Sequence, residues 1–351
     1  MTAQPGLIVL LGSGETSTTI RKVYNWLFEH LDTSIHIGIL ETPAGFEPNS
    51  ARVAEQVAEF FKLRLQNFQP RTSVIPARKR GTPHNPDNPE ILTPLLDTNV
   101  IIMGPGSPTY TVRQLHDSIA WQTLTARHRL GATLIFASAA TIAVSAQALP
   151  VYEIYKVGED LHWQPGLNLF EAFGLSLIFI PHWNNNDGGT ELDTSRCYMG
   201  QARYNQLIEL LPTQPTIVGI DERTALVIDP TEARGLVMGN GQVTIVRDSR
   251  ERCFATGQTF DLDELGPFCQ LSDPESGIPT ELWDRILTAQ TEARLQEKEP
   301  VPSREVLALF AERNAARGQK DWLSADELRD KIEALGWRVL DTPEGSHLKL
   351  L

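Results

Sequence analysis

The chain has 351 residues, beyond the usual size of one compact domain, so two domains or one domain with an appendage are expected. Its content of 41% hydrophobic and 21% charged residues is ordinary for a globular protein and is enough for a substantial core. The formal net charge of -13 opposes non-specific binding to nucleic acid, which needs many phosphate-neutralising lysines and arginines.

The three cysteines, Cys197, Cys253 and Cys269, are odd in number and show no C-x-x-C spacing. This pattern favours neither a disulfide framework nor a structural zinc site, and it indicates a reducing cytoplasm. The first apolar run, residues 6–12, follows no basic region and is too short to cross a membrane, so it predicts a strand and not a signal peptide. We therefore expect a cytoplasmic protein without membrane contact. No motif in the sequence implies a cofactor or a metal.

Short apolar runs alternate with helical stretches through the first half of the chain. These runs lie at residues 6–12, 35–41, 100–104, 132–138 and 176–182. Near-continuous apolar strands that alternate with helices predict an α/β fold, with a mostly parallel sheet covered by helices on both faces. The active site of such a sheet lies beyond the carboxyl ends of its strands. Glycine-rich turns, Ser138 and His182 follow these strands, so we expect them to converge on one rim.

The next stretch has the pattern of further strands. Residues 215–229 predict two strands joined by a turn. Residues 235–248 predict a hairpin in which Asn240 and Gly241 form a type I′ turn. Residues 249–302 are irregular in pattern, with scattered proline and glycine, and are expected to connect the main domain to the last part of the chain.

The last unit, residues 303–351, differs from the rest in its pattern of predicted helices and strands. A helix is predicted near 280–297, and the segment KEPVP, residues 298–302, indicates a linker into this unit. Ser303 can cap a helix that runs to about Gly318. A second helix carries an apolar stripe that is typical of a packing face, formed by Trp322, Ala325, Leu328, Ile332 and Leu335. A short hairpin ends the chain, so we expect a separable module with a small core of its own.

Ser138 raises a chemical question, because a strand that ends on a serine and turns into a helix can be a nucleophile elbow or an ordinary junction. A serine hydroxyl becomes a good nucleophile when a histidine takes its proton and a carboxylate orients that histidine. His182 ends another predicted strand, and Asp221 and Glu222 follow a third. Judged on these residues alone, the serine can equally be a helix cap, the histidine a structural residue and the acids solvated.

Several segments between residues 6 and 250 match one family in the same order. They are LIVLLGSGE, GILETPAGFEP, IIMGPGSPTYTVRQL, IFASAAT, IPHW, SRCYMGQARYNQL, VGIDERTALVID and VMGNGQVTIV. On these motifs the chain resembles the cyanophycinase and peptidase E group of serine peptidases, which share the class I glutamine amidotransferase-like fold. The order of serine, histidine and glutamate is the order found in that family.

This resemblance implies a role for each matching residue. The catalytic triad would consist of Ser138, His182 and Glu222. The positions around the oxyanion hole and the substrate would be Gly106, Ser107, Ala139 and Arg196. The neighbouring carboxylate, Asp221, would point to the opposite side of an extended backbone. The implied activity is hydrolysis of a peptide bond, or of a related amide bond in a small molecule.

The sequence also departs from the family pattern. Phe136 and Ala140 replace the two glycines of the elbow, so Phe136 must aim its side chain into the core. Pro105 replaces a glycine and has no N–H group, and the stretch NNNDGGTELD is inserted after the histidine strand. These departures favour an alternative function, that of a catalytically degenerate binding or regulatory module whose C-terminal unit recognises a partner protein or tRNA.

The tail has motifs of its own, namely ERNAARGQKDW, SADELRD and DTPEG. On these motifs the segment from about 305 to 350 resembles the C-terminal end of cysteinyl-tRNA synthetase. The whole chain is not expected to charge tRNA, because HIGI at residues 36–39 has Ile39 where the synthetase motif needs a second histidine. Specific tRNA binding would need four basic side chains on one face, those of Arg313, Arg317, Lys320 and Arg329.

The expected organisation has three parts. Residues 1–250 form the amidotransferase-like domain, and residues 303–351 form the small synthetase-like module with its pair of helices. Residues 251–302 form the region that connects the two. A core of about fifty residues is marginal by size. The module is therefore expected to lean on another surface through Trp322, Leu328 or Trp337.

Overall fold

The computed structural model describes residues 4–31, 33–211, 214–297, 302–342 and 345–350. The chain divides into two compact units, Met1–Gln290 and Thr291–Leu351. Apart from Pro302, the expected linker at 298–302 lies outside the described residues. Within the described part of the chain, every helix is too short or too polar to cross a membrane.

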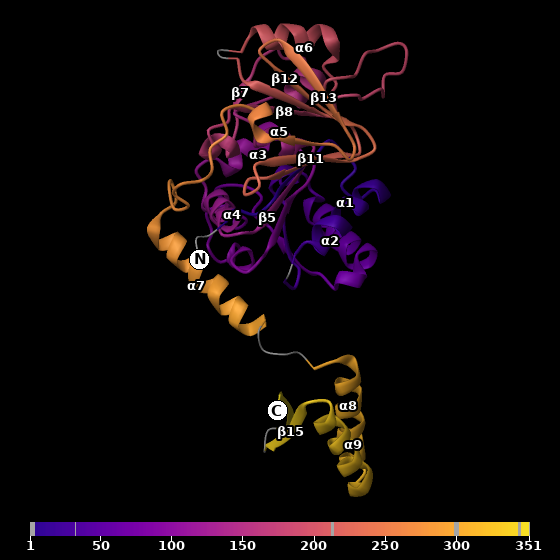
Figure 1. The fold of residues 1–351 in the computed structure, drawn as a ribbon. Helices are drawn as coiled ribbons and strands as arrows, with labels where there is room; N and C mark the ends of the chain where they lie inside the picture. Colours follow the sequence, from indigo (N-terminus) through magenta and orange to yellow (C-terminus); the bar gives the residue numbers. More distant parts are fainter. Residues whose placement is uncertain (1–3, 32, 212–213, 298–301, 343–344, 351) are drawn as a thin grey trace. The chain divides into compact units, whose positions relative to one another are not determined.

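An eight-stranded sheet forms the centre of the first unit, in the order β14-β11-β10-β1-β5-β4-β2-β3. Figure 1 labels β5 and β11 of this sheet. The parallel strands are β1 (Ile8–Leu11), β2 (His36–Leu40), β3 (Arg71–Ile75), β4 (Val100–Met103) and β5 (Thr133–Ala137). The antiparallel strands are β10 (Thr224–Asp229), β11 (Arg234–Gly239) and β14 (Thr259–Asp261). The predicted α/β fold with a mostly parallel central sheet is therefore confirmed.

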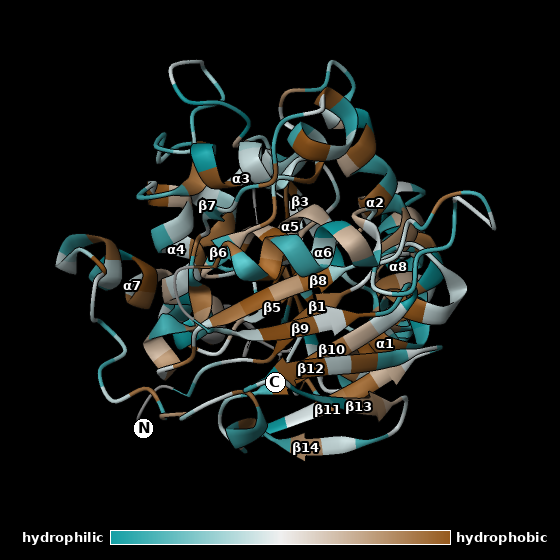
Figure 2. Ribbon diagram, turned by 90° about the horizontal axis from the view of Figure 1, so that it is seen from above, coloured by the Kyte–Doolittle hydropathy of each residue, from teal (hydrophilic) through white to brown (hydrophobic). Residues whose placement is uncertain are grey.

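Helices cover both faces of this sheet. Successive residues of β1 alternate, so that Ile8 and Leu10 join one buried cluster while Val9 and Leu11 join another. The helices that contribute to the second cluster are α1 (Thr18–Glu29) and α2 (Ser50–Arg64). Those that contribute to the first are α3 (Pro108–Leu115), α4 (Ile119–Arg129) and α5 (Ala139–Ala143). Burial on both faces explains why β1 is wholly apolar and why β5 is apolar after Thr133 (Figure 2).

A second sheet has four strands, in the order β13-β12-β9-β8. Its strands are β8 (Leu177–Pro181), β9 (Thr216–Ile220), β12 (Gln242–Arg247) and β13 (Arg250–Ala255), and α6 (Gly200–Glu209) precedes β9. The strand predicted at 176–182 therefore lies in this sheet and not in the main one. β8 and β9 run parallel, so the residues after Pro181 and after Ile220 leave the sheet at the same end. A small pair, β6 (Gln147–Ala148) with β7 (Gln164–Pro165), completes the strands of this unit.

The prediction of a hairpin turn at Asn240 and Gly241 is wrong, because β11 and β12 belong to different sheets. The chain crosses there from one sheet to the other, and a Cβ on Gly241 would come within 2.6 Å of the Asp221 Cβ. The two-residue hairpin turn lies instead between β12 and β13. Asp248 and Ser249 form it with φ values of 51° and 61°, the left-handed pair that a type I′ turn requires.

The stretch expected to connect the domains contributes to both sheets. β13 pairs with β12, and β14 pairs with β11. The helix expected near 280–297 is α7 (Thr280–Glu297), whose Trp283 and Ile286 pack against Ala126 and Leu130 of the first unit. The division between the compact units therefore falls at Gln290, later in the chain than residue 250.

The second unit contains α8 (Arg304–Gly318), α9 (Trp322–Ala334) and the hairpin of β15 (Trp337–Thr342) with β16 (Gly345–Leu350). The Ser303 hydroxyl caps α8 by accepting a hydrogen bond from the Val306 N–H at 3.2 Å. The module has its own core of Val306, Ile332, Trp337 and Val339. Trp337 thus packs inside the module and does not reach outward, whereas Trp322 is 56% exposed.

Candidate active site

Ser138 stands where β5 meets α5, in a strained backbone conformation with φ 52° and ψ -108°. Its side chain makes no capping hydrogen bond to the helix, so the hydroxyl is not used as a helix cap. The two residues that replace the elbow glycines, Phe136 and Ala140, are fully buried in the core. The junction has the sharp strand-to-helix geometry of a nucleophile elbow.

The Ser138 hydroxyl contacts His182, which follows β8. Its Oγ lies 2.6 Å from the Nε2 atom of His182, and the Nδ1 atom of the same ring lies 3.2 Å from Oε1 of Glu222. A proton on Nδ1 is directed to the carboxylate, which leaves Nε2 free to accept the hydroxyl proton. Three residues from three separate strand ends therefore come together as the sequence led us to expect.

Glu222 is held by two asparagines of the inserted stretch. Asn185, only 3% exposed, donates from Nδ2 to Oε1 of Glu222 at 2.9 Å. The N–H group of Glu222 donates to Oδ1 of Asn184, also at 2.9 Å. The hydrogen bond from His182, reinforced by the one from Asn185, lowers the pKa of Glu222 against the opposing effect of burial. The insertion departs from the family pattern, and its contact with Glu222 was not predicted from the sequence, although three asparagines after the histidine strand were the available signal.

Asp221 faces the other way. Its carboxylate accepts a hydrogen bond from the Gln242 N–H at 3.0 Å, and the residue is 6% exposed. Burial raises the pKa of Asp221, which the hydrogen bond from Gln242 partly opposes. The two adjacent carboxylates therefore have separate partners: Glu222 contacts His182, and Asp221 joins the end of β9 to the start of β12.

Two residues that the family resemblance implies for the oxyanion hole lie at the cavity. Gly106 and Ala139 line the cavity beside Ser138, and no hydrogen bond within the described residues uses the N–H of either. Gly106 passes so close to the loop after β2 that a Cβ there would lie 1.9 Å from the Pro43 carbonyl oxygen. Ser107, expected at the same hole, is engaged elsewhere, because its N–H donates to Pro43 and its hydroxyl caps α3.

Arg196 does not line the cavity. Its guanidinium lies 3.9 Å from the centroid of the Trp183 ring and donates to the Trp183 carbonyl at 3.0 Å. Left-handed φ values at three consecutive residues, Arg196, Cys197 and Tyr198, turn the chain sharply at this point. The turn brings Cys197 and Tyr198 to the cavity and leaves Arg196 on the Trp183 side. The substrate contact expected for Arg196 is therefore not made by this arrangement.

The cavity beside Ser138 and His182 has a volume of about 500 Å³. One wall is a single turn of π-helix, Glu153–Val157, which supplies Tyr155 and Lys156 and follows directly on Tyr152. Such π-turns are rare and often occur at functional sites. Among the described residues, no group of three histidine, cysteine or acidic side chains is placed to hold a metal ion.

In the second unit, the basic residues proposed for tRNA are divided between two environments. Arg313 is 1% exposed and donates to both carboxylate oxygens of Asp341, at 2.7 and 2.6 Å. This hydrogen bond is the main reason that the pKa of Asp341 lies well below its usual range. Arg317 also reaches Asp341, at 3.0 Å, and stands over the Trp322 ring at 5.6 Å. Arg313 is thus used inside the module, and the surface of four cations that specific tRNA binding would need is not formed.

Comparison with known proteins separates the two units. Residues 300–347 match the family described as the cysteinyl-tRNA ligase anticodon binding domain. Over 43 residues the chain is 56% identical to cysteine–tRNA ligase 1 of Burkholderia lata, covering 12% of this chain and 9% of the ligase. The ligase of Afipia carboxidovorans is 42% identical over 55 residues, covering 16% and 12% of the two chains. The chain therefore spans only about a tenth of the length of these curated relatives.

The fold of the larger part resembles a solved peptidase. The crystal structure of a peptidase from an acI-B1 Actinobacterium superposes with a TM-score of 0.60 and 22% identity. The match covers 74% of this chain and 98% of that one. At this identity the likeness establishes the fold. The resemblance of the tail to the synthetase terminus is confirmed by the family match, and the peptidase-type fold by this superposition.

Proposed function

We propose that the first unit is a serine hydrolase acting on peptide bonds or on related amides, with Ser138, His182 and Glu222 as its triad. The observation that carries the proposal is the 2.6 Å contact between Ser138 Oγ and His182 Nε2. A serine that merely capped α5 would direct its hydroxyl to the helix N–H groups, and this one does not. The strained φ of Ser138 adds support, because such backbone strain gathers at functional sites.

The chemistry follows from the positions of the groups. Ser138 Oγ attacks the amide carbonyl carbon as its proton passes to His182 Nε2, and Glu222 stabilises the imidazolium that forms. The N–H groups of Gly106 and Ala139 receive the developing oxyanion. Collapse of the tetrahedral intermediate expels the amine, which takes the proton from His182, and leaves an ester on Ser138. Water then hydrolyses this ester by the same route, with His182 again as base and acid.

Covalent labelling with a fluorophosphonate tests this function. The reagent phosphonylates an activated serine and releases fluoride, so the wild-type chain is expected to take up one label at Ser138. Ser138→Ala should take up none, and His182→Ala should slow labelling by about a thousandfold. Ser272→Ala, at an exposed position outside the cavity, is the matched control and should be labelled as fast as the wild type. Equal labelling of Ser138→Ala and the wild type would end the proposal.

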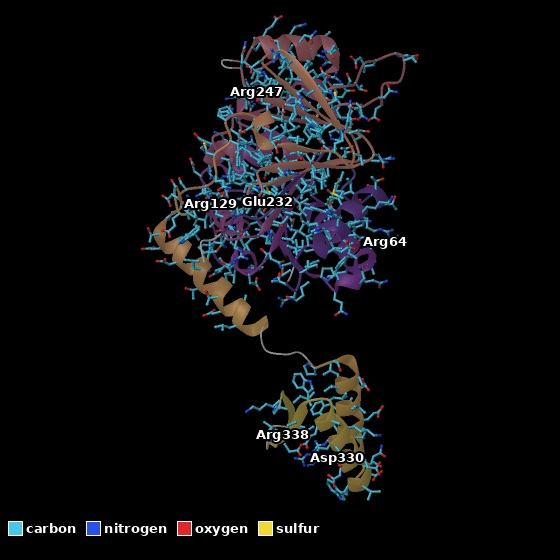
Figure 3. All side chains as sticks on the ribbon, in the orientation of Figure 1. Arg64, Arg129, Glu232, Arg247, Asp330 and Arg338 are labelled. Carbon is cyan, nitrogen blue, oxygen red and sulfur yellow. The ribbon has the colours of Figure 1, made fainter. Side chains whose placement is uncertain are left out.

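The second unit, residues 303–351, supports another candidate function, recognition of tRNA or of a partner protein. The family match over residues 300–347 favours it. Because Arg313 is buried, the cations proposed to contact RNA are Arg317 and Lys320, close to the exposed Trp322 ring. Figure 3 labels two other exposed charges of this unit, Asp330 and Arg338, which have opposite signs.

Binding of the full chain to tRNA, compared with a generic RNA of equal length, tests this candidate. The double variant Arg317→Ala with Lys320→Ala should weaken tRNA binding by about tenfold and reduce its salt dependence. Arg338→Ala serves as the control for loss of one exposed cation. If the full chain prefers neither RNA, the tRNA assignment fails and a protein partner is the remaining candidate.

A further inference from the structure

We infer that the cavity beside Ser138 receives an aromatic or large aliphatic side chain next to the scissile bond, while Lys156 receives a carboxylate of the same substrate. This inference rests on the proposed hydrolase function and adds the substrate class. It depends on three features of the cavity: an apolar wall, a set of neutral aromatic rings, and one cation without an acidic partner.

The wall of the cavity is apolar where it is most deeply buried. Ile142, Val151 and Cys197 are 2%, 8% and 2% exposed, and they belong to the same hydrophobic cluster. Burial raises the pKa of the Cys197 thiol, so the thiol remains neutral and behaves as a small hydrophobic group. A charged side chain placed against this wall would lose its hydration and gain no partner there.

Three tyrosines complete the lining, namely Tyr152, Tyr155 and Tyr198. The rings of Tyr155 and Tyr198 lie 5.3 Å apart at a tilt of 40°, and the Tyr198 ring lies 5.9 Å from that of His182. Tyr198 donates its hydroxyl proton to Asp187 at 3.1 Å, and burial is the main cause that raises the pKa of Tyr198 to about 12. These rings offer neutral aromatic surface close to the nucleophile, which suits another ring or a branched aliphatic chain.

Charge in the cavity is sparse. Two charged side chains line it, Lys156 and Asp187, and Asp187 is already bound to Tyr198. Arg196, the other cation expected near the substrate, is stacked on Trp183 outside the lining. Lys156 is exposed and forms no ion pair within the described part of the chain, so its ammonium group can receive a substrate carboxylate at the rim. Apart from Lys156, no described residue of the lining is a lysine or arginine that would select an acidic side chain.

An adjoining cavity of about 570 Å³ lies beyond Tyr152, and two residues of its lining serve as control positions for the experiments below. It shares Tyr152 and Lys156 with the first and is otherwise lined by different residues, including Phe46, Lys79 and Arg113. Its other charged residues are of both signs, because Glu47 and Glu153 also line it. Phe46 and Lys79 therefore match Tyr155 and Lys156 in chemistry and lie outside the cavity that contains Ser138.

Boronic acids that compete with fluorophosphonate labelling measure this preference without turnover. Ser138 Oγ would bond to boron as its proton passes to His182, so no leaving group is needed. Four N-acetyl aminoboronic acids are compared, with benzyl, isobutyl, carboxymethyl and guanidinopropyl side chains. The benzyl and isobutyl compounds are expected to halve labelling at concentrations about tenfold or more below those of the two charged compounds. Tyr155→Ala should reduce this advantage, and Phe46→Ala should preserve it.

An N-succinyl form of the benzyl compound tests Lys156. Its added carboxylate should improve competition by about threefold to tenfold over the N-acetyl form. The gain should vanish in Lys156→Met and survive in Lys79→Met. Stronger competition by the carboxymethyl or guanidinopropyl compound overturns the inference and leaves the hydrolase proposal intact, as does a succinyl gain that persists in Lys156→Met. Absence of fluorophosphonate labelling in the wild type ends both.

Discussion

At the scale of single residues, the candidate site depends on side chains that contact no reacting atom. Asn185 is buried and donates to the same Glu222 oxygen that faces His182. A carboxylate fixed by two donors loses little freedom when the imidazolium forms, so the residue that orients it is a positioning residue for the proposed reaction.

Asn185→Ala is expected to slow labelling of Ser138 by about tenfold, because one hydrogen bond to a charged group is removed. Loss of this donor also raises the pKa of Glu222, since the hydrogen bond from Asn185 helps to lower it. The acid side of the pH profile of labelling should therefore move to higher pH. Asn186→Ala is the matched control, because it removes the neighbouring, exposed amide of the same insertion. Equal effects of the two substitutions would contradict a specific role for Asn185.

At the scale of elements, the loop between β4 and α3 carries the second candidate oxyanion donor. The close approach of Gly106 to Pro43 sets the path of this loop, and Ser107 holds it by donating its N–H to the same carbonyl at 3.0 Å. The loop geometry thus depends on contact with the segment after β2, which is distant in sequence.

Gly106→Ala should slow labelling of Ser138 by about a hundredfold or more, which is the usual cost of losing one oxyanion donor. The added Cβ would lie 1.9 Å from the Pro43 oxygen, so the backbone must move. Gly104→Ala, two residues earlier, is the control, because a Cβ there meets nothing within 4 Å. Labelling rates and thermal unfolding are measured for both variants. A Gly106→Ala chain that labels at the wild-type rate would remove this loop from the proposed mechanism.

In the second unit, an ion pair joins a helix to the hairpin, since Arg313 of α8 binds Asp341 of β15. Asp341→Asn should destabilise this unit by roughly 2–3 kcal/mol, because the buried guanidinium loses its counter-charge. Asp330→Asn, at an exposed position of α9, is the control. Hydrogen exchange of the α8 and β15 amides measures the effect, and equal protection in both variants would count against it.

The pH dependence of that pair has a definite sign. The folded-state pKa of Asp341 is lowered, so its contribution to stability is present above the ordinary aspartate pKa of about 4. The contribution is lost progressively as pH falls below that value. Wild type and Asp341→Asn should therefore differ at neutral pH and converge in strong acid.

At the scale of the whole molecule, the chain combines two units with separate cores. Truncation after Pro300 is expected to leave fluorophosphonate labelling of Ser138 unchanged, because every residue of the proposed triad and oxyanion hole lies before Gln290. Circular dichroism of the shortened chain confirms that it is folded. A folded truncated chain that no longer labels would show that the tail shapes the active site.

The sequence by itself determined the elements and the order of the chemistry. Apolar strands with helical intervals predicted the central sheet, and Ser303 marked the start of its helix, because periodicity and caps are local properties. The order of Ser138, His182 and Glu222 also followed from sequence, through strand ends and family motifs. The edge strand β3 was missed because three of its five residues are only half-buried and the pattern is not apolar.

Only the tertiary structure decided which strands pair and where each side chain points. β8 and β12 both pair with β9 in the second sheet, although α6 separates β8 from β9, and β10 and β11 separate β9 from β12. Pairing across intervening elements is a long-range choice. Three side-chain contacts were likewise decided by the tertiary structure. They are the hydrogen bond from Asn185 to Glu222, the stacking of Arg196 on Trp183 and the ion pair of Arg313 with Asp341. Each of these polar groups takes the partner that folding places within reach, and local sequence does not specify that partner.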